Sequence, residues 1–155
     1  MSWWIWPTTA DVGIRVFSPT KSSLIDDIII GMQSVVLPPN YEYEDDLVIS
    51  EKQWFHPNDR DLDRLIVRIL EEVLYMCEVN DQWVISSKTR ISEDDIGIIF
   101  TYVNENCITR DVQIKAITRH NLEAMYLEIG ESDIHTGSTP EMIGPGWYGS
   151  VVFDL

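Results

Sequence analysis

Two stretches of the chain carry apolar residues at helical spacing, with polar residues between them, which is the pattern of an amphipathic helix. The apolar positions of the first stretch are Leu24, Ile25, Ile28, Ile29, Met32, Val35 and Val36. Pro38 and Pro39 follow and predict its end, because a residue before proline disfavours the helical region. The apolar positions of the second stretch are Leu62, Leu65, Ile66, Ile69, Leu70, Val73 and Leu74. Asp59 or Asp61 is placed to cap this second helix, which we expect to end near residues 80–81.

The remaining pattern is that of β-strands. Val12, Ile14 and Val16 alternate with glycine and arginine, which is the period of a half-buried strand. Residues 41–55 mix aromatic and β-branched residues with acids and predict a strand and a loop. Beyond the second helix, runs of β-branched and aromatic residues predict further strands. These five candidate strands cover residues 83–85, 98–102, 112–117, 124–127 and 146–154.

Helices and antiparallel strands in one chain predict an α+β fold, with a mostly antiparallel sheet packed against two main helices. The chain has 155 residues, which is long enough to bury a core without disulfides or metal, and we expect one domain over residues 1–155. Residues 130–145 are rich in Gly, Ser, Thr and Pro. They predict a long and mobile hairpin loop between the last two strands.

The chain is strongly acidic, with a formal net charge of -15 and a pI of about 4.3. Such a surface repels phosphate backbones, so direct nucleic-acid binding is disfavoured. It attracts a basic protein or a cation and speeds their encounter. The alternative is that the carboxylates only aid solubility. Trp3, Trp4 and Trp6 would suit RNA stacking, but without flanking Lys or Arg they more simply cover a sheet edge or groove, or form a partner patch.

Cysteine usage and targeting signals bear on location. Cys77 and Cys107 show no CxxC or Cys/His spacing, which is typical of a reduced, intracellular protein rather than of a disulfide framework or zinc site. Residues 1–6 are apolar but short and lack the basic start of a signal peptide. No run approaches the roughly 20 apolar residues of a membrane span. We therefore expect a cytoplasmic protein without a membrane partner.

Three segments, far apart in the sequence, place charged residues beside strand-like runs. Asp11 precedes the first predicted strand, Lys115 lies within the 112–117 strand, and Asp154 ends the last strand. Desolvating an unpaired charge is costly, so a strand normally avoids Asp and Lys. Three such exceptions in one small domain predict that these groups meet each other, a metal ion or a partner.

The same three segments resemble the motifs of archeases, small acidic proteins that assist the RtcB-type RNA ligase. Archeases typically open with His-Thr-Ala-Asp-Ile-Gly, where residues 8–13 here read Thr-Thr-Ala-Asp-Val-Gly. They carry Lys-Ala-Val-Thr-Tyr-His, where residues 115–120 read Lys-Ala-Ile-Thr-Arg-His. They end in Val-Phe-Asp and a hydrophobic residue, matched by residues 152–155. The order of motifs and helices also agrees, so the resemblance spans nearly the whole chain and implies an archease-like layered fold.

The resemblance implies a divalent cation held by Asp11, Asp154 and the backbone carbonyl of Leu155. Carboxylates at adjacent strand ends form a hard-oxygen site, which suits calcium, with magnesium or manganese as alternatives. Without the resemblance, Asp11 is equally explained by an Asx-turn or cap, and Asp154 by a solvated acid at the end of a strand.

Lys115 and the residues after it form the second part of the predicted site. The resemblance implies that this lysine is needed for activity, paired with an acid of the site or presented to the ligase. The alternative is an edge-strand lysine that blunts aggregation. Thr118 and His120 continue the strand on the opposite face from Lys115. His120 could act as a ligand or a proton carrier near neutral pH, although a lone histidine is more often structural.

Two positions depart from the archease pattern. Thr8 stands where the family has histidine, and Arg119 where it has tyrosine. Threonine neither titrates near neutral pH nor binds metal as imidazole does. The functional contribution of residue 8 is therefore in question, whereas a metal site built on carboxylates would survive.

The resemblance implies a non-enzymatic activator of the RtcB-type tRNA-splicing RNA ligase, which promotes guanylylation and multiple turnover of the ligase. One alternative is a protein-binding module that keeps the fold and has lost ligase activation through Thr8. Another is a metal-dependent hydrolase, in which the site's acids, Lys115 and His120 activate water on a bound ion.

Overall fold

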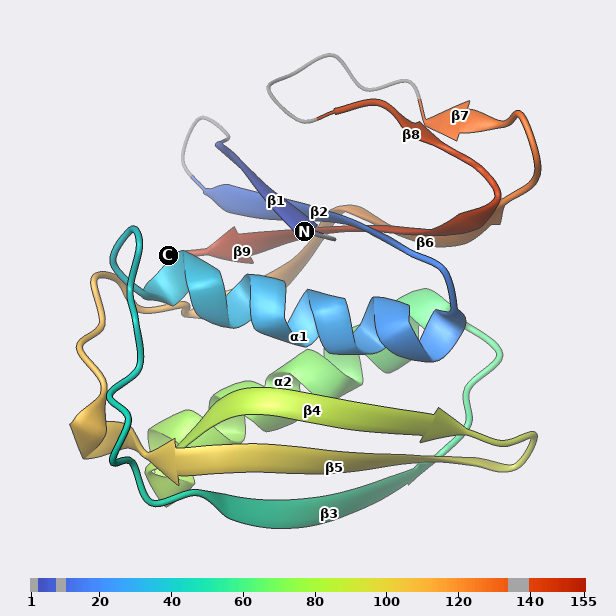
Figure 1. Ribbon diagram of the computed structural model, residues 1–155. Helices are drawn as coiled ribbons and strands as arrows, with labels where there is room; N and C mark the ends of the chain where they lie inside the picture. The colour runs from blue at the N-terminus through green and yellow to red at the C-terminus, as the bar shows by residue number, and fades with distance from the viewer. Residues whose placement is uncertain (1–2, 8–10, 134–139) are drawn as a thin grey trace.

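Two antiparallel sheets enclose the two main helices in the computed structural model, which describes residues 3–7, 11–133 and 140–155 (Figure 1). The first sheet has the order β1-β2-β9-β6, and the second has the order β3-β5-β4. The first sheet consists of β1 (Trp3–Pro7), β2 (Val12–Ser18), β9 (Gly146–Asp154) and β6 (Ala116–Leu127). The second consists of β3 (Ser50–Pro57), β5 (Asp95–Asn104) and β4 (Gln82–Ile91), and a 3-10 turn, η1 (Glu105–Cys107), follows β5. The predicted α+β class, with antiparallel strands packed on two main helices, is confirmed, although the strands form two main sheets rather than one.

Both predicted helices form, and their ends follow the expected capping chemistry. Helix α1 (Lys21–Val36) begins after Thr20, which forms a capping box with Ser23. Helix α2 (Leu62–Asn80) begins after Asp61, whose side chain accepts a hydrogen bond from the backbone N–H of Arg64. Of the two candidate caps, Asp61 is therefore the one used. The helix ends at Asp81, which adopts the left-handed conformation (φ 55°) that closes many helices.

One hydrophobic core fills the space between the two sheets. The apolar faces of α1 and α2 pack there against the inner faces of both sheets. The residues of this core that have no solvent exposure include Ile14, Leu24, Leu70 and Phe100. Gly149 in β9 allows α1 to approach closely, because a Cβ at this position would lie 3.1 Å from Cδ1 of Ile28. The helices therefore connect the two sheets and hold the first sheet from its inner face.

A second, smaller cluster covers the outer face of the first sheet. The short strands β7 (Ser132–Asp133) and β8 (Met142–Ile143) pair with each other and lie above this sheet (Figure 1). Arg15 of β2 is fully buried beneath them, donates to the Tyr148 hydroxyl at 3.3 Å and forms an ion pair with Asp133. The described ends of the predicted 130–145 loop thus form a hairpin, while residues 134–139 lie outside the described residues.

Two of the predictions for the β-strands need correction. Residues 3–7 form the edge strand β1, whereas the sequence predicted that the tryptophans cover a sheet edge or groove, or form a partner patch, and gave no strand there. The predicted 112–117 and 124–127 strands are wrong as separate elements, because one long strand, β6, starts at Ala116. The register of β6 on β9 begins at Ala116 opposite Asp154, and Lys115 just before it donates one backbone hydrogen bond to the Asp154 carbonyl without belonging to the strand. The 41–55 segment forms a loop followed by a strand from Ser50 onward, in agreement with the predicted strand and loop.

Two further findings concern the cysteines and the helices. Cys77 and Cys107 are free thiols. Burial raises the pKa of the Cys77 thiol to about 11, so this thiol stays protonated at neutral pH. In the described part of the chain, neither helix has the length and apolar character needed to cross a bilayer.

A half-buried carboxylate joins α1 to the second sheet. Asp26 accepts hydrogen bonds from the hydroxyls of Ser87 and Thr89, both at 2.7 Å, and from the Thr89 backbone N–H. Burial nevertheless dominates and raises the pKa of Asp26 above its usual 3.8. The charged form is therefore less favoured in the folded protein than in the unfolded chain.

We predict that Asp26→Asn removes a pH-dependent component of stability. A raised pKa in the folded state means that the contribution of Asp26 is greatest below pH 3.8 and is lost as pH rises through the higher folded value. The free energy of unfolding of the natural protein, relative to D26N, should fall over that window. Urea unfolding of both proteins at low concentration, followed by tryptophan fluorescence, measures this difference. A difference that grows with pH would show that the hydrogen bonds outweigh the burial.

Candidate functional site

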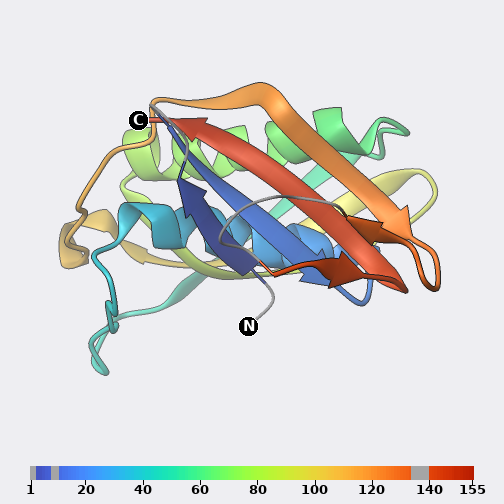
Figure 2. The ribbon, with the colours of Figure 1, turned by 90° about the horizontal axis from the view of Figure 1, so that it is seen from above.

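The three charged segments singled out in the sequence meet at one end of the first sheet. Strand β9 pairs with β2 on one side and with β6 on the other. Val12 lies opposite Phe153, and Ala116 lies opposite Asp154. The starts of β2 and β6 therefore flank the end of β9, and Figure 2 shows these three strand ends together beside the C-terminus. The fold thus brings residues more than a hundred positions apart into one place.

The two predicted metal-binding acids lie at the adjoining ends of the paired strands β2 and β9. If the register of β2 and β9 is continued by one residue, Asp11 lies beside Asp154. Asp154 is exposed and Asp11 is half-buried. The backbone carbonyl of Asp154 accepts a hydrogen bond from the Lys115 N–H at 2.7 Å, and Leu155 packs against the main core. The last two residues are therefore held by main-chain pairing and by packing, which leaves the Asp154 side chain at the surface.

The donor set at this end consists of hard oxygens. Asp11 and Asp154 supply two carboxylates, and the Leu155 carbonyl is adjacent in the chain. Within the described ranges, no cluster of three or more His, Cys, Asp or Glu side chains could hold a metal ion. Calcium takes about 6–8 oxygen ligands. These residues therefore fit part of a calcium or magnesium shell, which water or a partner would have to complete.

The backbone of Lys115 lies at the same end of the sheet as Asp154, but the residue lines a different surface, beside α2. It is exposed, precedes β6, and lines a shallow groove of about 610 Å³ with Leu74, Tyr75 and Glu78 of α2. In the described part of the chain, no carboxylate lies within ion-pair distance of its ammonium group. The prediction that Lys115 lies within a strand is wrong, so the alternation argument does not apply to it. Of the two roles considered, this position favours presentation to a partner.

The remaining predicted residues differ in their surroundings. Thr118 lies opposite Val152 and is half-buried, and its hydroxyl finds no hydrogen-bond partner among the described residues. His120 and Arg119 are exposed and lie where the register of β6 on β9 is interrupted, between Thr118 and Glu123. The structure does not bring His120 into a metal-binding group with the acids. Thr8 lies outside the described residues.

Sequence reasoning missed one contact beside the site. The Trp6 indole packs directly over Gly13, where a Cβ would lie 2.6 Å from the ring. Trp6 and Gly13 face each other in the β1–β2 pairing, and Gly13 is two residues after Asp11. The glycine in the motif is the signal that could have indicated a close approach, because only glycine leaves room for the ring.

Comparison with known proteins identifies the class. The model of the archease protein family (MTH1598/TM1083) matches residues 3–155, so this chain belongs to the archease family. The fold also matches the solution structure of protein 1598 from Methanobacterium thermoautotrophicum. That match has a TM-score of 0.61 and 16% sequence identity, and covers 99% of each chain. No curated protein matches the sequence. Archeases are in general accessory proteins that act with a partner protein.

We predict that Thr118→Val leaves the fold intact. Valine has nearly the same shape and removes a buried hydroxyl that lacks a partner among the described residues. The free energy of unfolding should stay unchanged or rise by up to about 1 kcal/mol. Chemical denaturation measures this difference. A loss of more than about 1 kcal/mol would show that the hydroxyl makes a stabilising hydrogen bond.

Proposed function

We propose that this archease activates an RtcB-type tRNA-splicing RNA ligase, promoting guanylylation of the ligase and its multiple turnover. The single observation that carries the proposal is the meeting of the three family motifs at one end of the sheet. There Asp11 directly precedes β2, Asp154 ends its partner β9, and Lys115 donates its backbone N–H to the backbone carbonyl of Asp154. In this role the protein is an activator and not itself the enzyme.

The acid pair is proposed to hold a divalent cation at the contact with the ligase. Asp11, Asp154 and the Leu155 carbonyl would bind it, and calcium, magnesium or manganese are all compatible with oxygen donors. A bound cation would supply positive charge for phosphate groups at the ligase's nucleotide site. The partial donor set supports a shared site, in which the ligase or its nucleotide completes the coordination shell. The acidic protein, with net charge -15, would approach a basic surface rapidly.

Lys115 is proposed to contact the ligase beside this cation. Its exposed ammonium group lies at the margin of the groove with α2, where Glu71 and Glu78 are also found. This position suits an interaction with an acidic or phosphorylated group of the partner better than neutralisation of the protein's own acids.

The second candidate function is a binding module that has lost ligase activation. Thr8, in place of the family histidine, is the observation that favours it, because threonine cannot replace the acid–base or metal-binding chemistry of imidazole. The carboxylate pair would still allow such a module to bind the ligase.

We predict that Asp154→Ala abolishes stimulation while the fold stays intact. The variant removes a carboxylate at the strand end but keeps the backbone carbonyl to which Lys115 donates. The measurement is multiple-turnover ligation of RNA ends by a limiting amount of the RtcB-type ligase from the same source. Asp94→Ala, which removes an exposed carboxylate from the β4–β5 turn, is the matched control and should stimulate fully.

Two further measurements examine cation binding by the protein in the absence of the ligase. The natural protein alone should bind calcium weakly, with a dissociation constant on the order of 10⁻⁴ to 10⁻³ M, because its own donors are few. A chelator should leave its thermal midpoint unchanged, because neither Asp11 nor Asp154 belongs to the core between the sheets. Full stimulation by Asp154→Ala would refute the proposed role of the acid pair.

We predict that Thr8→His distinguishes the two candidate functions. If activation is retained, the natural protein already stimulates the ligase, and the variant changes turnover little. If activation has been lost through this position, only the variant stimulates. The same ligation assay, with binding of both proteins to the ligase measured in parallel, provides the answer. Absence of stimulation by either protein, with an active ligase, would contradict the activator proposal.

A further inference from the structure

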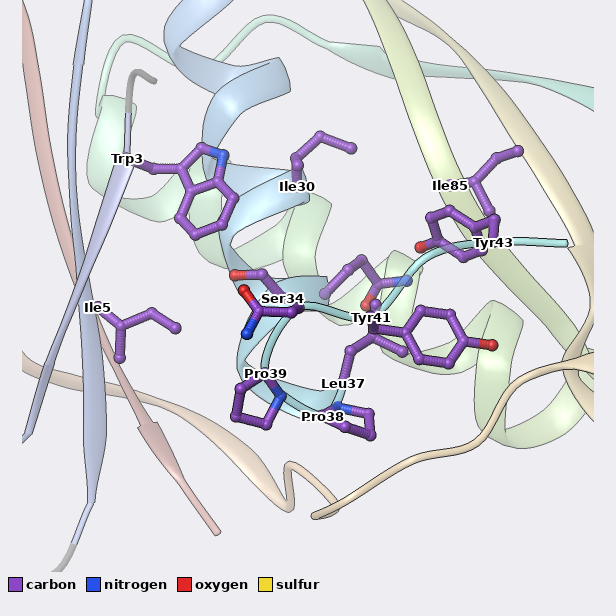
Figure 3. Close-up of a pocket in the computed structure, with 12 residues that line it drawn as sticks. Trp3, Ile5, Ile30, Ser34, Leu37, Pro38, Pro39, Tyr41, Tyr43 and Ile85 are labelled. Carbon is purple, nitrogen blue, oxygen red and sulfur yellow. The ribbon is translucent and has the colours of Figure 1, made fainter.

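A groove lies between the edge strand β1, the C-terminal half of α1 and the segment that follows this helix (Figure 3). We call it the β1 groove. It has a volume of about 350 Å³, and none of the residues that line it is charged. Its walls include Trp3, Ile5, Leu37, Pro38 and Tyr41. It is a different surface from the site at Asp11 and Asp154, whose residues do not line it.

The aromatic wall of the β1 groove is held in place from behind. The Tyr43 hydroxyl accepts a hydrogen bond of 3.1 Å from Nε1 of Trp83, a fully buried residue of β4. Tyr41 packs edge-on against Tyr43 with 5.5 Å between ring centroids. The Gln33 side chain donates to the Val84 carbonyl at 2.9 Å. These contacts hold the wall of the groove in place before a ligand binds. A preformed groove reduces the entropy cost of ordering these side chains on binding.

One side of the groove is an open sheet edge. Strand β1 is terminal in the first sheet, and among the described strands it pairs only with β2. Figure 2 shows it at the outer margin of that sheet. Its other edge carries backbone donors and acceptors that an added strand can use. Trp3 and Ile5 face the groove, so every second side chain of an added strand would point into it.

The chain segment that forms the tyrosine wall of the groove, residues 41–46, also carries exposed acidic residues. Glu42, Glu44, Asp45 and Asp46 are all exposed and lie within or just after the Tyr41–Tyr43 wall. In the described part of the chain, none of these four carboxylates forms an ion pair. An uncharged aromatic groove bordered by acids is complementary to a segment that carries both apolar and basic residues.

We propose that the β1 groove binds an extended basic segment of a partner protein. The segment adds a strand to the open edge of β1 and places apolar side chains against Trp3, Leu37 and Tyr41. Its Lys and Arg side chains contact the acids that follow Tyr41. This inference does not depend on the proposed ligase activation, and either one can fail without the other.

The test uses the full chain and defined peptides. The first probe is an amidated nine-residue peptide in which Lys or Arg alternates with Val, Leu or Ile. The second carries Glu at every basic position, and the third has N-methylated backbone amides that cannot pair with a strand. Binding is followed by Trp fluorescence and by amide chemical shifts at low and high salt. Only the first probe should bind measurably, with shifts concentrated at β1 and residues 37–46.

Two double variants distinguish the effect of the acids beside the groove on peptide binding from the effect of the protein's net charge. E42Q/E44Q should weaken binding of the basic peptide about three- to tenfold, as expected for two exposed charge contacts. E93Q/D94N changes the net charge equally in the distant β4–β5 turn and should change binding less than twofold, because exposed charges are screened beyond about 10 Å. Ile5→Ser, at a side chain that is 44% exposed, should also weaken binding while the fold is retained.

Several outcomes would overturn the proposal. These are no saturable binding of the basic peptide, equal binding of the acidic or N-methylated peptide, or equal effects of the two double variants. Chemical shifts confined to the Asp154 end would assign binding to the other surface. A dimer that forms through β1 and excludes the peptide would show that the edge binds a second copy instead.

Discussion

The position of β9 is the constraint on which the rest of the structure depends. This strand lies between β2 and β6, with α1 on its inner face and the β7–β8 hairpin on its outer face, so nearly all of its residues are buried. A slip by one residue would move Val151 and Phe153 out of the main core, which fixes the register strongly. The same register sets Ala116 opposite Asp154, and Val12, the residue after Asp11, opposite Phe153. The geometry of the candidate site is therefore a consequence of core packing rather than of attraction among its charges.

The sequence predicted the helices better than the strands, because helix signals are local. The apolar stripe of α2, its Asp61 cap and its left-handed end at Asp81 all lie within the helix or next to it. Strand identity depends on partners far away in the chain. β1 was missed because its three tryptophans do not show the alternation that marks a strand, and only pairing with β2 defines it. β6 was divided because the register break after Thr118 interrupts its pattern of apolar residues.

The candidate site was predictable where motif and topology agree. The neighbouring positions of Asp11 and Asp154 follow from their places at opposite ends of antiparallel partners. The surroundings of Lys115 and His120 could not be read in the same way. Lys115 lies outside the strand, and His120 lies in the irregular part of β6, so a period of two assigns neither to a face. The packing of Trp6 on Gly13 also depends on the unforeseen strand β1.

The distribution of Lys and Arg side chains indicates that the acidity of this archease does more than keep the protein in solution. Several basic side chains are used to neutralise acids on or near α2: Lys52 and Arg68 contact Glu72, and Arg110 contacts Glu78 and Glu105. These pairs lie at the partly exposed surface, where ion pairs add little stability but remove negative potential from that face. In the described residues, Asp154 and the acids after Tyr41 have no such compensation. Negative charge therefore remains at the sheet end and beside the β1 groove, two places where the geometry also leaves oxygen donors or backbone groups available to a partner.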